Sequence, residues 1–360
     1  MSIGTQIRFT NASTGGPDTP VAPESPKSQR IPALDFTKGA LVLIMVVYHW
    51  INYFIDPEWK YLFYLRFLTP SFIFISGFMI SHVYLSKYSA ADARLSRRLI
   101  TRGLKLFAIF VVLNLARDVI APSSGAGKAA LGMVSAKILV MFFIFGNLPA
   151  EGPKLVSFSI LVPISYLLVA SGALMPLYRS YRYVFHIACF GLLLASLIFG
   201  YAGARNFNLE FVAIGMLGVL VGFAPIEAIE SVRRHPYVLT LAYLSYLIAI
   251  TIWNVPFLLL IVAVFLNLCI LYLVGASGNS ASAARNEVIL LGKYSLLGYI
   301  AQVAILQLLS KGFQHINLGA TRWLGSFAAA VILTILTVEA VDRVRARSNS
   351  ADRLYRAVFA

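Results

Sequence analysis

Apolar runs about as long as a bilayer is thick recur along this chain, and they limit its possible folds more than any other feature. A helix needs about 20 apolar residues to cross a membrane. With 59% hydrophobic and 12% charged residues, the composition also lies outside the range of ordinary soluble domains. The expected spans lie at about 30–54 and 61–85, in a third run that ends near 119, and at about 155–175, 183–201, 209–224, 236–253, 254–275, 287–311 and 322–341. The sequence therefore predicts an all-α fold, a polytopic membrane helical bundle of about ten transmembrane helices.

The basic residues decide the expected orientation. A net charge of +15 could indicate nucleic-acid binding, but the Lys and Arg residues are clustered between apolar runs, as they are in cytoplasmic loops. The run at 131–146 is short, about 24 Å as a helix, and it contains Lys137. If this run does not cross, most arginine-rich segments fall on the cytoplasmic side. We therefore predict that 131–146 is an interfacial or re-entrant segment on the outer side and that both termini are cytoplasmic.

Composition divides the chain into three parts. Residues 1–29 are rich in Ser, Thr, Pro and Gly and are predicted to be a disordered cytoplasmic tail. Residues 30–342 form the predicted membrane domain, and residues 343–360 form a basic cytoplasmic tail. Cys189 and Cys269 both lie inside apolar runs, so they indicate neither a disulfide framework nor a metal site.

The first predicted span, 30–54, carries polar residues on one helical face. Asp35 and Lys38 are three residues apart at its start and can pair. Lys38 and His49 are eleven residues apart, close to three helical turns, so they share a face and lie about 16 Å apart along the axis. An ionisable side chain inside a span is a candidate functional residue. The alternatives are a hydrogen-bonded core histidine and, for the charged pair, an interfacial anchor.

Two segments after this span hold further candidates. Ser76 and Gly77 in the second span are small, so a helix or a ligand can approach the backbone closely there. The basic segment that follows obeys the positive-inside rule, and arginines beside a membrane entrance can also clamp phosphates. Its candidate phosphate-binding residues are Arg97, Arg98, Arg102 and Lys105.

The late span at 287–311 carries a polar stripe. Ser295, Tyr299 and Gln302 share one helical face, and Tyr294 precedes them. Polar side chains inside a span indicate a substrate path. Hydrogen bonds between packed helices would explain them equally well.

Short patterns in these segments carry a family resemblance. LDFTKG is followed by His49, eleven residues after its lysine, and FIFISGFMI lies in the second span. These elements resemble the LDxxRG pattern with its histidine and the FFxxSGF element of the acyltransferase-three family, and the arginines at 97–102 resemble its arginine run. LGKYSLLGYIAQ is similar to the LGxxSxxxYxxH helix of the wider transmembrane acyltransferase superfamily, which includes a heparan-glucosaminide N-acetyltransferase-like branch.

The resemblance implies an acyltransferase that moves an acyl group, commonly acetyl, from cytoplasmic acyl-CoA to a hydroxyl or amine of an extracytoplasmic carbohydrate. His49 would be catalytic, either deprotonating the acceptor or accepting the acyl group itself, and Asp35 and Lys38 would form an entrance pair. The acyl-CoA phosphates would be held by Arg97, Arg98, Arg102 and Lys105. Helix contacts or the substrate path would be formed by Ser76, Gly77, Tyr294, Ser295, Tyr299 and Gln302.

The sequence departs from the family pattern at two positions. Lys38 stands where the family has arginine, which keeps the charge but loses the bidentate fork. Gln302 stands where the superfamily helix has histidine, and an amide cannot carry a titrating proton.

The expected partners are the lipid bilayer, acyl-CoA as donor substrate and a carbohydrate acceptor, with no bound cofactor, no metal and no nucleic acid. The expected location is the cytoplasmic (inner) membrane of a bacterium. A transporter or flippase for a hydrophilic glycan or anion is the alternative function, and inverted repeats with paired broken helices would support it. A non-catalytic membrane scaffold would leave His49 without a role.

Overall fold

The computed structural model describes residues 31–55, 60–85, 93–120, 141–146, 157–225, 231, 235–253, 256–277, 282–313 and 321–359. The chain divides into two units, Met1–Arg30 and Ile31–Ala360. The tail predicted at 1–29 lies outside the described residues, and all described helices belong to the second unit. That unit is helical, with no strand in the ranges that the structure describes.

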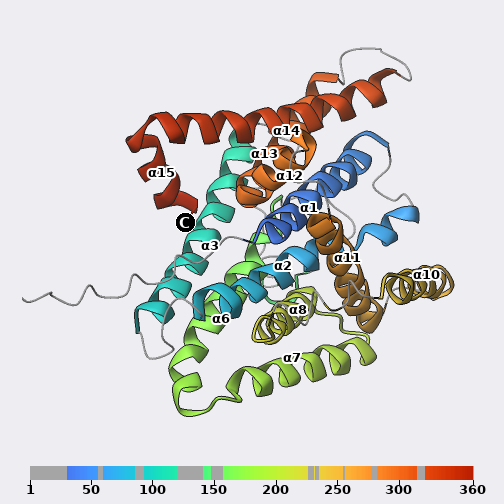
Figure 1. Ribbon diagram of the computed structural model, residues 1–360, viewed down its shortest axis with the longest axis vertical. Coiled ribbons are helices and arrows are strands. Elements are labelled where there is room, and N and C mark those ends of the chain that lie inside the picture. Colours follow the sequence, from blue (N-terminus) through green and yellow to red (C-terminus); the bar gives the residue numbers. More distant parts are fainter. Residues whose placement is uncertain are drawn as a thin grey trace, which may run out of the picture. The chain divides into compact units, whose positions relative to one another are not determined.

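The helices follow one another along the chain, and Figure 1 labels them in order. Their bounds are α1 Pro32–Trp50, α2 Leu68–Met79, α3 Ala93–Ile120, α6 Leu161–Ser180, α7 Val184–Tyr201, α8 Phe207–Val221, α10 Pro236–Ile252, α11 Phe257–Ser277, α12 Ala283–Lys293, α13 Ser295–Phe313, α14 Thr321–Arg347 and α15 Asn349–Phe359. α1 and α2 each continue into a short π-helical segment, Ile51–Ile55 and Ile80–Leu85.

Eight helical segments in the described ranges are long and apolar enough to cross a membrane. They are Pro32–Ile55, Leu62–Leu85, Arg94–Arg117, Leu161–Ser180, Val184–Tyr201, Phe257–Ser277, Ser295–Phe313 and Trp323–Arg347. Two shorter apolar helices, α8 and α10, lie at the positions of the sixth and seventh predicted spans. The predicted polytopic helical bundle is therefore confirmed.

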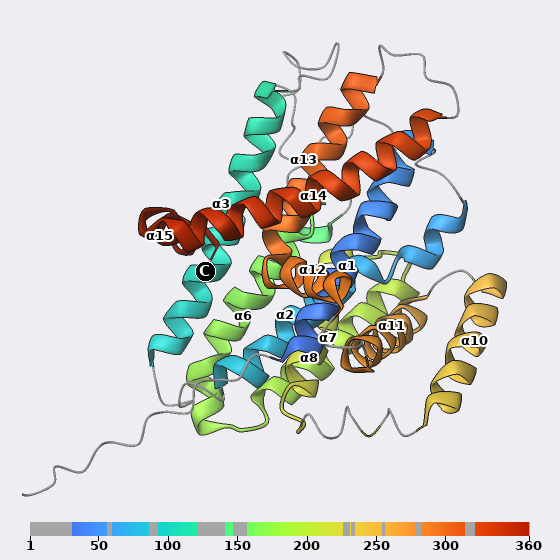
Figure 2. The same cartoon turned by 45° about the horizontal axis from the view of Figure 1, so that its top comes forward.

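α1 packs against α2, α11, α12, α13 and α14 (Figures 1 and 2). Its contact with α12 is made by glycine on both sides. A Cβ atom at Gly39 would overlap the carbonyl oxygen of Val288, and one at Gly292 would overlap that of Asp35. Small residues let two backbones approach this closely where lipid supplies no hydrophobic driving force between helices. The contact fixes the Lys38 end of α1 against the end of α12.

Gly77 makes a similar contact between α2 and α8. A Cβ atom there would overlap the carbonyl oxygen of Gly215, so this glycine lies in a helix–helix contact. The neighbouring Ser76 donates its hydroxyl hydrogen bond to the carbonyl oxygen of Phe72 at 2.8 Å. Adjacent positions of one motif thus face different surroundings, since Ser76 also reaches the cavity described below.

The span predicted at 287–311 is divided into α12 and α13, so the prediction of one continuous helix is wrong. Tyr294 lies between them with φ −112° and ψ 29°. Its hydroxyl is held by two residues of α14, Asp342 and Arg345. Hydrophobic periodicity does not reveal such a break, because the cause is a tertiary contact with residues about 50 positions later in the chain.

The segment predicted at 131–146 is described only from 141 onward, and residues 131–140 lie outside the described residues. Met141–Phe145 forms a single π-helical turn. The ring of Phe142 stacks on that of Phe110 in α3, with centroids 5.7 Å apart. The Asn208 side-chain amide donates to carbonyl oxygens of this turn at 2.9 Å. The described end of the segment is thus attached to both α3 and α8.

Residues 343–359 of the predicted basic tail are helical apart from Ser348, which separates α14 from α15. The last long helix, α14, continues to Arg347. α15 then turns back from α14 and lies beside α3 (Figures 1 and 2). This return brings the end of the chain to the same part of the bundle as the start of α1.

Candidate active site

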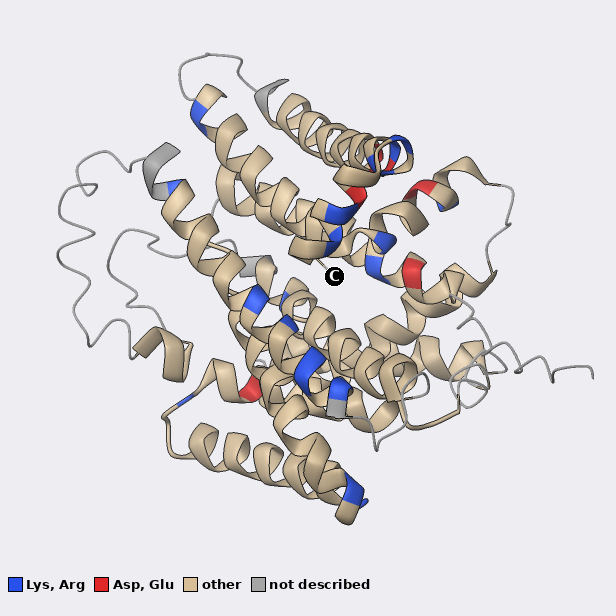
Figure 3. Ribbon diagram, turned by 90° about the vertical axis from the view of Figure 1, so that its left-hand side faces the viewer, with Lys and Arg blue, Asp and Glu red and all other residues tan. Residues whose placement is uncertain are grey.

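A cavity of about 220 Å³ lies between α1, α2, α3, α6, the α12–α13 junction and α15. Three cationic side chains from different helices line it: Lys38, Arg102 and Lys293. Figure 3 shows Lys and Arg on several helices around the end of α15. The hydroxyl groups in its wall belong to Ser76, Tyr84, Tyr294, Ser295, Tyr299 and Tyr355. Cations and phenols in one concave site suit an anionic ligand with an aromatic part.

The charged pair expected at the start of α1 is present. Lys38 Nζ lies 2.5 Å from Asp35 Oδ1, and the two side chains are 17% and 14% exposed. An ammonium group has three donors, and Asp35 takes one of them. Because Lys38 also lines the cavity, its other donors are available to a ligand there.

The four basic residues predicted to bind phosphates do not all reach the cavity. Arg102 lines it and donates a hydrogen bond to the hydroxyl of Tyr84. Arg97 and Arg98 are exposed, and Lys105 is half-buried outside the lining. The structure thus separates one arginine in the cavity wall from two on the outer surface of α3.

The polar stripe of the late span divides in the same way. Tyr294, Ser295 and Tyr299 line the cavity. Gln302, one turn beyond Tyr299, is fully buried, and its amide nitrogen and oxygen have no hydrogen-bond partner among the described residues. A buried amide without partners costs about 1–3 kcal/mol. Gln302 thus lies in the helix packing beyond the cavity wall.

His49 lies beyond Tyr299 rather than in the cavity wall. The ring centroids of His49 and Tyr299 are 6.4 Å apart, and His49 is half-buried. Tyr299 thus contacts both the cavity and the surroundings of the imidazole. Phe158 packs edge-on against the same tyrosine ring at 6.1 Å. Tyr299 is thus the cavity residue whose ring lies near that of His49.

A polar cluster close to His49 was not predicted from the sequence. Tyr53 follows His49 by one turn, and its hydroxyl accepts a hydrogen bond from Gln307 Nε2 at 3.1 Å. The same nitrogen donates to Ser157 Oγ at 2.9 Å, and Arg117 donates to that oxygen at 3.2 Å. Gln307, a polar residue in an apolar span, was the available signal, but its partners come from segments up to 254 residues away.

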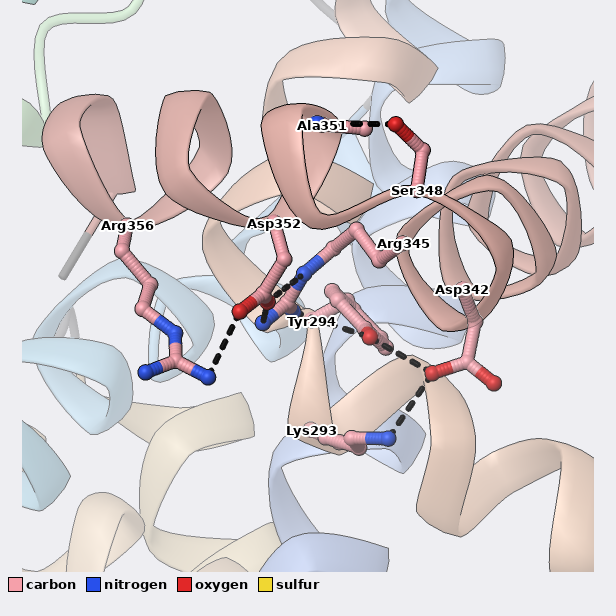
Figure 4. Close-up of polar contacts among 8 residues, drawn as sticks. All are labelled: Lys293, Tyr294, Asp342, Arg345, Ser348, Ala351, Asp352 and Arg356. Atoms are coloured by element: carbon pink, nitrogen blue, oxygen red, sulfur yellow. Dashed lines mark hydrogen bonds and ion pairs between the residues drawn. The ribbon is translucent and has the colours of Figure 1, made fainter.

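The α12–α13 junction and α15 are joined by a network of ion pairs and hydrogen bonds (Figure 4). Arg345 donates to Asp352 at 3.0 and 2.5 Å and to the Tyr294 hydroxyl at 2.9 Å. The Tyr294 hydroxyl donates to Asp342 at 2.5 Å, and Lys293 lies 2.8 Å from the same carboxylate. The network holds α15 in place at the wall of the cavity.

The titration of two groups in this network follows from their surroundings. Hydrogen bonds from Arg345 hold the pKa of the Asp352 carboxyl below its ordinary value. Burial raises the pKa of Tyr294 to about 12, so its phenol remains protonated and keeps donating at neutral pH. In the described ranges, no three His, Cys, Asp or Glu side chains lie together as a metal site would require.

Residues 30–171 match the family model described as heparan-alpha-glucosaminide N-acetyltransferase, catalytic. The match covers less than half of the 360 residues and includes Lys38, His49, Ser76 and Arg102. No curated protein and no solved structure matches the chain. The match supports a membrane acetyltransferase family and confirms the predicted enzyme class, an acyltransferase for groups other than aminoacyl groups. It does not single out the acyltransferase-three family.

Proposed function

We propose that this chain is an integral membrane acetyltransferase that takes an acetyl group from cytoplasmic acyl-CoA and transfers it to an amine or hydroxyl of an extracytoplasmic carbohydrate. The observation that carries the proposal is the arrangement along α1. The cationic cavity at Lys38 and the imidazole of His49 lie about three turns apart on one helix, with Tyr299 between them. The name of the matched family favours acetyl as the group and a glucosaminide as the acceptor.

The phosphate groups of the donor suit the cationic cavity. Lys38, Arg102 and Lys293 present N–H donors from three helices, and charge-assisted hydrogen bonds to phosphate are among the strongest in proteins. Exposed cations attract an anion before it binds. We assign that role, together with a direct phosphate contact, to the remaining residues of the predicted set, Arg97, Arg98 and Lys105.

His49 performs the proton transfer in the proposed reaction. The lone pair of the acceptor nitrogen or oxygen attacks the thioester carbonyl carbon while His49 takes the acceptor proton. The carbon–sulfur bond then breaks, and the departing thiolate receives that proton, so that the products are the acetylated acceptor and CoA. In the covalent alternative, His49 accepts the acetyl group first and passes it to the acceptor.

The polar cluster of Tyr53, Gln307, Ser157 and Asn114 suits the acceptor. Asn114 donates to the Ser157 carbonyl oxygen and accepts from the Ser157 backbone N–H, both within 2.9 Å. Neutral donors and acceptors at this density can exchange hydrogen bonds with sugar hydroxyls. Tyr53 follows His49 by one turn, so an acceptor bound to this cluster would lie near the proposed base.

The proposed orientation puts both termini in the cytoplasm of a bacterium, with the chain in its inner membrane. A reporter fused in the loop before α3 and another fused after α15 should both read cytoplasmic. An external signal from the second fusion would mean that the number of crossings is odd and that 131–146 spans the membrane.

The proposed activity can be tested with the protein in liposomes, by measuring the transfer of label from radiolabelled acetyl-CoA to two oligosaccharide acceptors. One acceptor is an oligosaccharide ending in a glucosaminide, and its N-acetylated form offers hydroxyls only. Label in the first alone indicates an amine acceptor, and label in both indicates hydroxyls. If wild-type protein labels neither above the level of His49→Ala, the proposal is wrong. Movement of unmodified sugar across the membrane would favour the transporter alternative.

A further inference from the structure

We propose that α15 carries a stacking site for the base of the acyl-CoA donor, with Tyr355 as the ring on which the base stacks and Phe359 occupying that place in the structure. The inference rests on the proposed function and adds a part of the ligand to it. It assigns the nucleotide end of the donor, a flat aromatic base joined to phosphates, to α15.

The two aromatic residues of α15 are part of the cavity wall. Tyr355 and Phe359 are four residues apart, so they lie on one face of the helix, and both line the cavity. Their rings are stacked, with centroids 4.9 Å apart and planes 28° apart. This is the offset arrangement that aromatic rings favour. Any nucleotide base can stack on a tyrosine ring in the same way, because every base has a flat aromatic face.

The Tyr355 ring is held by other groups. The Arg345 guanidinium lies 4.0 Å over the ring, and the Tyr294 ring meets it edge-on at 5.4 Å. A guanidinium and a stacked ring at these distances cannot share one face, so Arg345 and Phe359 lie on opposite faces. Arg345 is itself fixed by Asp352. Moving Phe359 aside would therefore expose one face of a ring that is already oriented, which lowers the cost of binding.

The cavity also supplies the phosphate ligands that a nucleotide needs. Lys38, Arg102 and Lys293 line the same cavity as the two aromatic rings, so base and phosphates can bind together. With Phe359 in place, its volume of about 220 Å³ is below the roughly 300–1,000 Å³ of pockets that hold drug-sized ligands. The base needs the room that the Phe359 ring fills.

Two acetyl-donor substrates, one with a nucleotide and one without, distinguish base stacking on Tyr355 from a general role of α15 in folding. Acetyl-CoA carries the nucleotide, whereas acetyl-4′-phosphopantetheine has the same thioester and arm without it. Tyr355→Ala should raise the KM for acetyl-CoA by about 5- to 150-fold, the loss of one base stacked on one aromatic ring, and leave the KM for acetyl-4′-phosphopantetheine unchanged. Tyr355→Phe should recover most of the affinity. Leu354→Ala, at a 67% exposed position of the same helix, is the matched control.

Phe359→Ala gives an expectation of the opposite sign. It should lower the KM for acetyl-CoA and not that for acetyl-4′-phosphopantetheine, and a damaged fold does not produce a gain of this kind. If Tyr355→Ala shifts both donors equally, or if Phe359→Ala weakens acetyl-CoA, the stacking site is ruled out.

Binding of adenosine 3′,5′-bisphosphate to the full-length protein, measured by calorimetry, separates this inference from the proposed function. Binding that is lost in Tyr355→Ala and kept in Tyr355→Phe, without any acetyl transfer, would support the stacking site and contradict the function. Acetyl transfer from acetyl-CoA that is indifferent to both variants would do the reverse. If wild-type protein shows neither binding nor transfer, both proposals fail.

Discussion

Two regions along α1, the cavity at Lys38 and the polar cluster beside His49, differ in how their polar groups are paired. At the cavity end, cations are matched by acids: Lys38 with Asp35, Lys293 with Asp342, and Arg345 with Asp352. Beside His49, the hydrogen bonds run mainly between neutral groups of Tyr53, Gln307, Asn114 and Ser157, with Arg117 at their edge. One end suits phosphate and the other suits hydroxyl groups, which is the division that a transfer between an anionic donor and a sugar requires.

Arg102 is an exception to the pairing at the cavity end. Its guanidinium contacts the neutral hydroxyl and ring of Tyr84, whereas Lys38 and Lys293 each share their charge with a carboxylate. A cation paired with a phenol keeps its full attraction for an anion. Arg102 should therefore contribute more to donor binding than either lysine.

The largest effect should follow from removing His49, the proposed base. His49→Ala should lower kcat by about 10²- to 10⁴-fold, the usual contribution of a general base. Because His49 lies outside the cavity wall, the affinity for acetyl-CoA should not change. Transfer rates and donor binding, measured with variant protein at the wild-type level in the membrane, check both points. Substantial remaining transfer would remove His49 from the mechanism.

The next largest effect should fall on the donor alone. Arg102→Gln should raise the KM for acetyl-CoA by about 10- to 150-fold, the loss of a charged hydrogen bond worth about 1.5–3 kcal/mol. The KM for the carbohydrate should stay the same. The matched control is Arg97→Gln with Arg98→Gln, which removes two exposed charges from the same helix.

We expect this double variant to lose less affinity than Arg102→Gln, because water screens exposed charges. An unchanged donor KM would mean that Arg97 and Arg98 serve only the orientation of the chain. A loss as large as that of Arg102→Gln would mean that they also contact phosphate directly, as the sequence predicts.

A smaller effect should fall on the acceptor alone. Gln307→Leu removes the amide that hydrogen-bonds to Tyr53 and Ser157, and the loss of one neutral hydrogen bond to the acceptor is worth about 0.5–1.5 kcal/mol. The KM for the carbohydrate should rise by about 2- to 13-fold, with that for acetyl-CoA unchanged. Asn267→Leu is the matched control, since the Asn267 amide donates within α11 to the Ala263 carbonyl oxygen. A shift in the donor KM would contradict the division into two ends.

The sequence predicted the elements whose cause is local and missed those whose cause is distant. Apolar runs located the bundle, and a three-residue spacing located the Asp35–Lys38 pair, because both depend on neighbours along the chain. The break at Tyr294 depends on α14, and the polar cluster depends on Ser157 and Gln307, 150 residues apart. The position of α15 was missed for the same reason, since a run of arginines in a tail does not show that Tyr355 lines a cavity.

Substitutions of Lys38 should give the smallest change in the KM for acetyl-CoA, and they test whether a cation paired with an acid at the cavity end also binds the donor. Lys38→Arg should change the KM for acetyl-CoA by about twofold or less, because arginine keeps the charge and adds a fork suited to phosphate. This variant alone does not separate donor binding from neutralising Asp35. Lys38→Met leaves the Asp35 carboxylate, which is 14% exposed, without its partner, and such a charge destabilises the fold.

Adding Asp35→Asn to Lys38→Met removes that buried charge and separates the two roles of the lysine. If Lys38 only neutralises Asp35, the double variant should recover both the amount of folded protein and the donor affinity. If Lys38 also holds phosphate, folded protein should return while the KM for acetyl-CoA stays several-fold high, since an ordinary hydrogen bond is worth about 1 kcal/mol and a charged one more. We favour the second outcome, because the lysine reaches the cavity with donors that Asp35 does not use. Full recovery of the donor KM would reduce the cationic wall to Arg102 and Lys293.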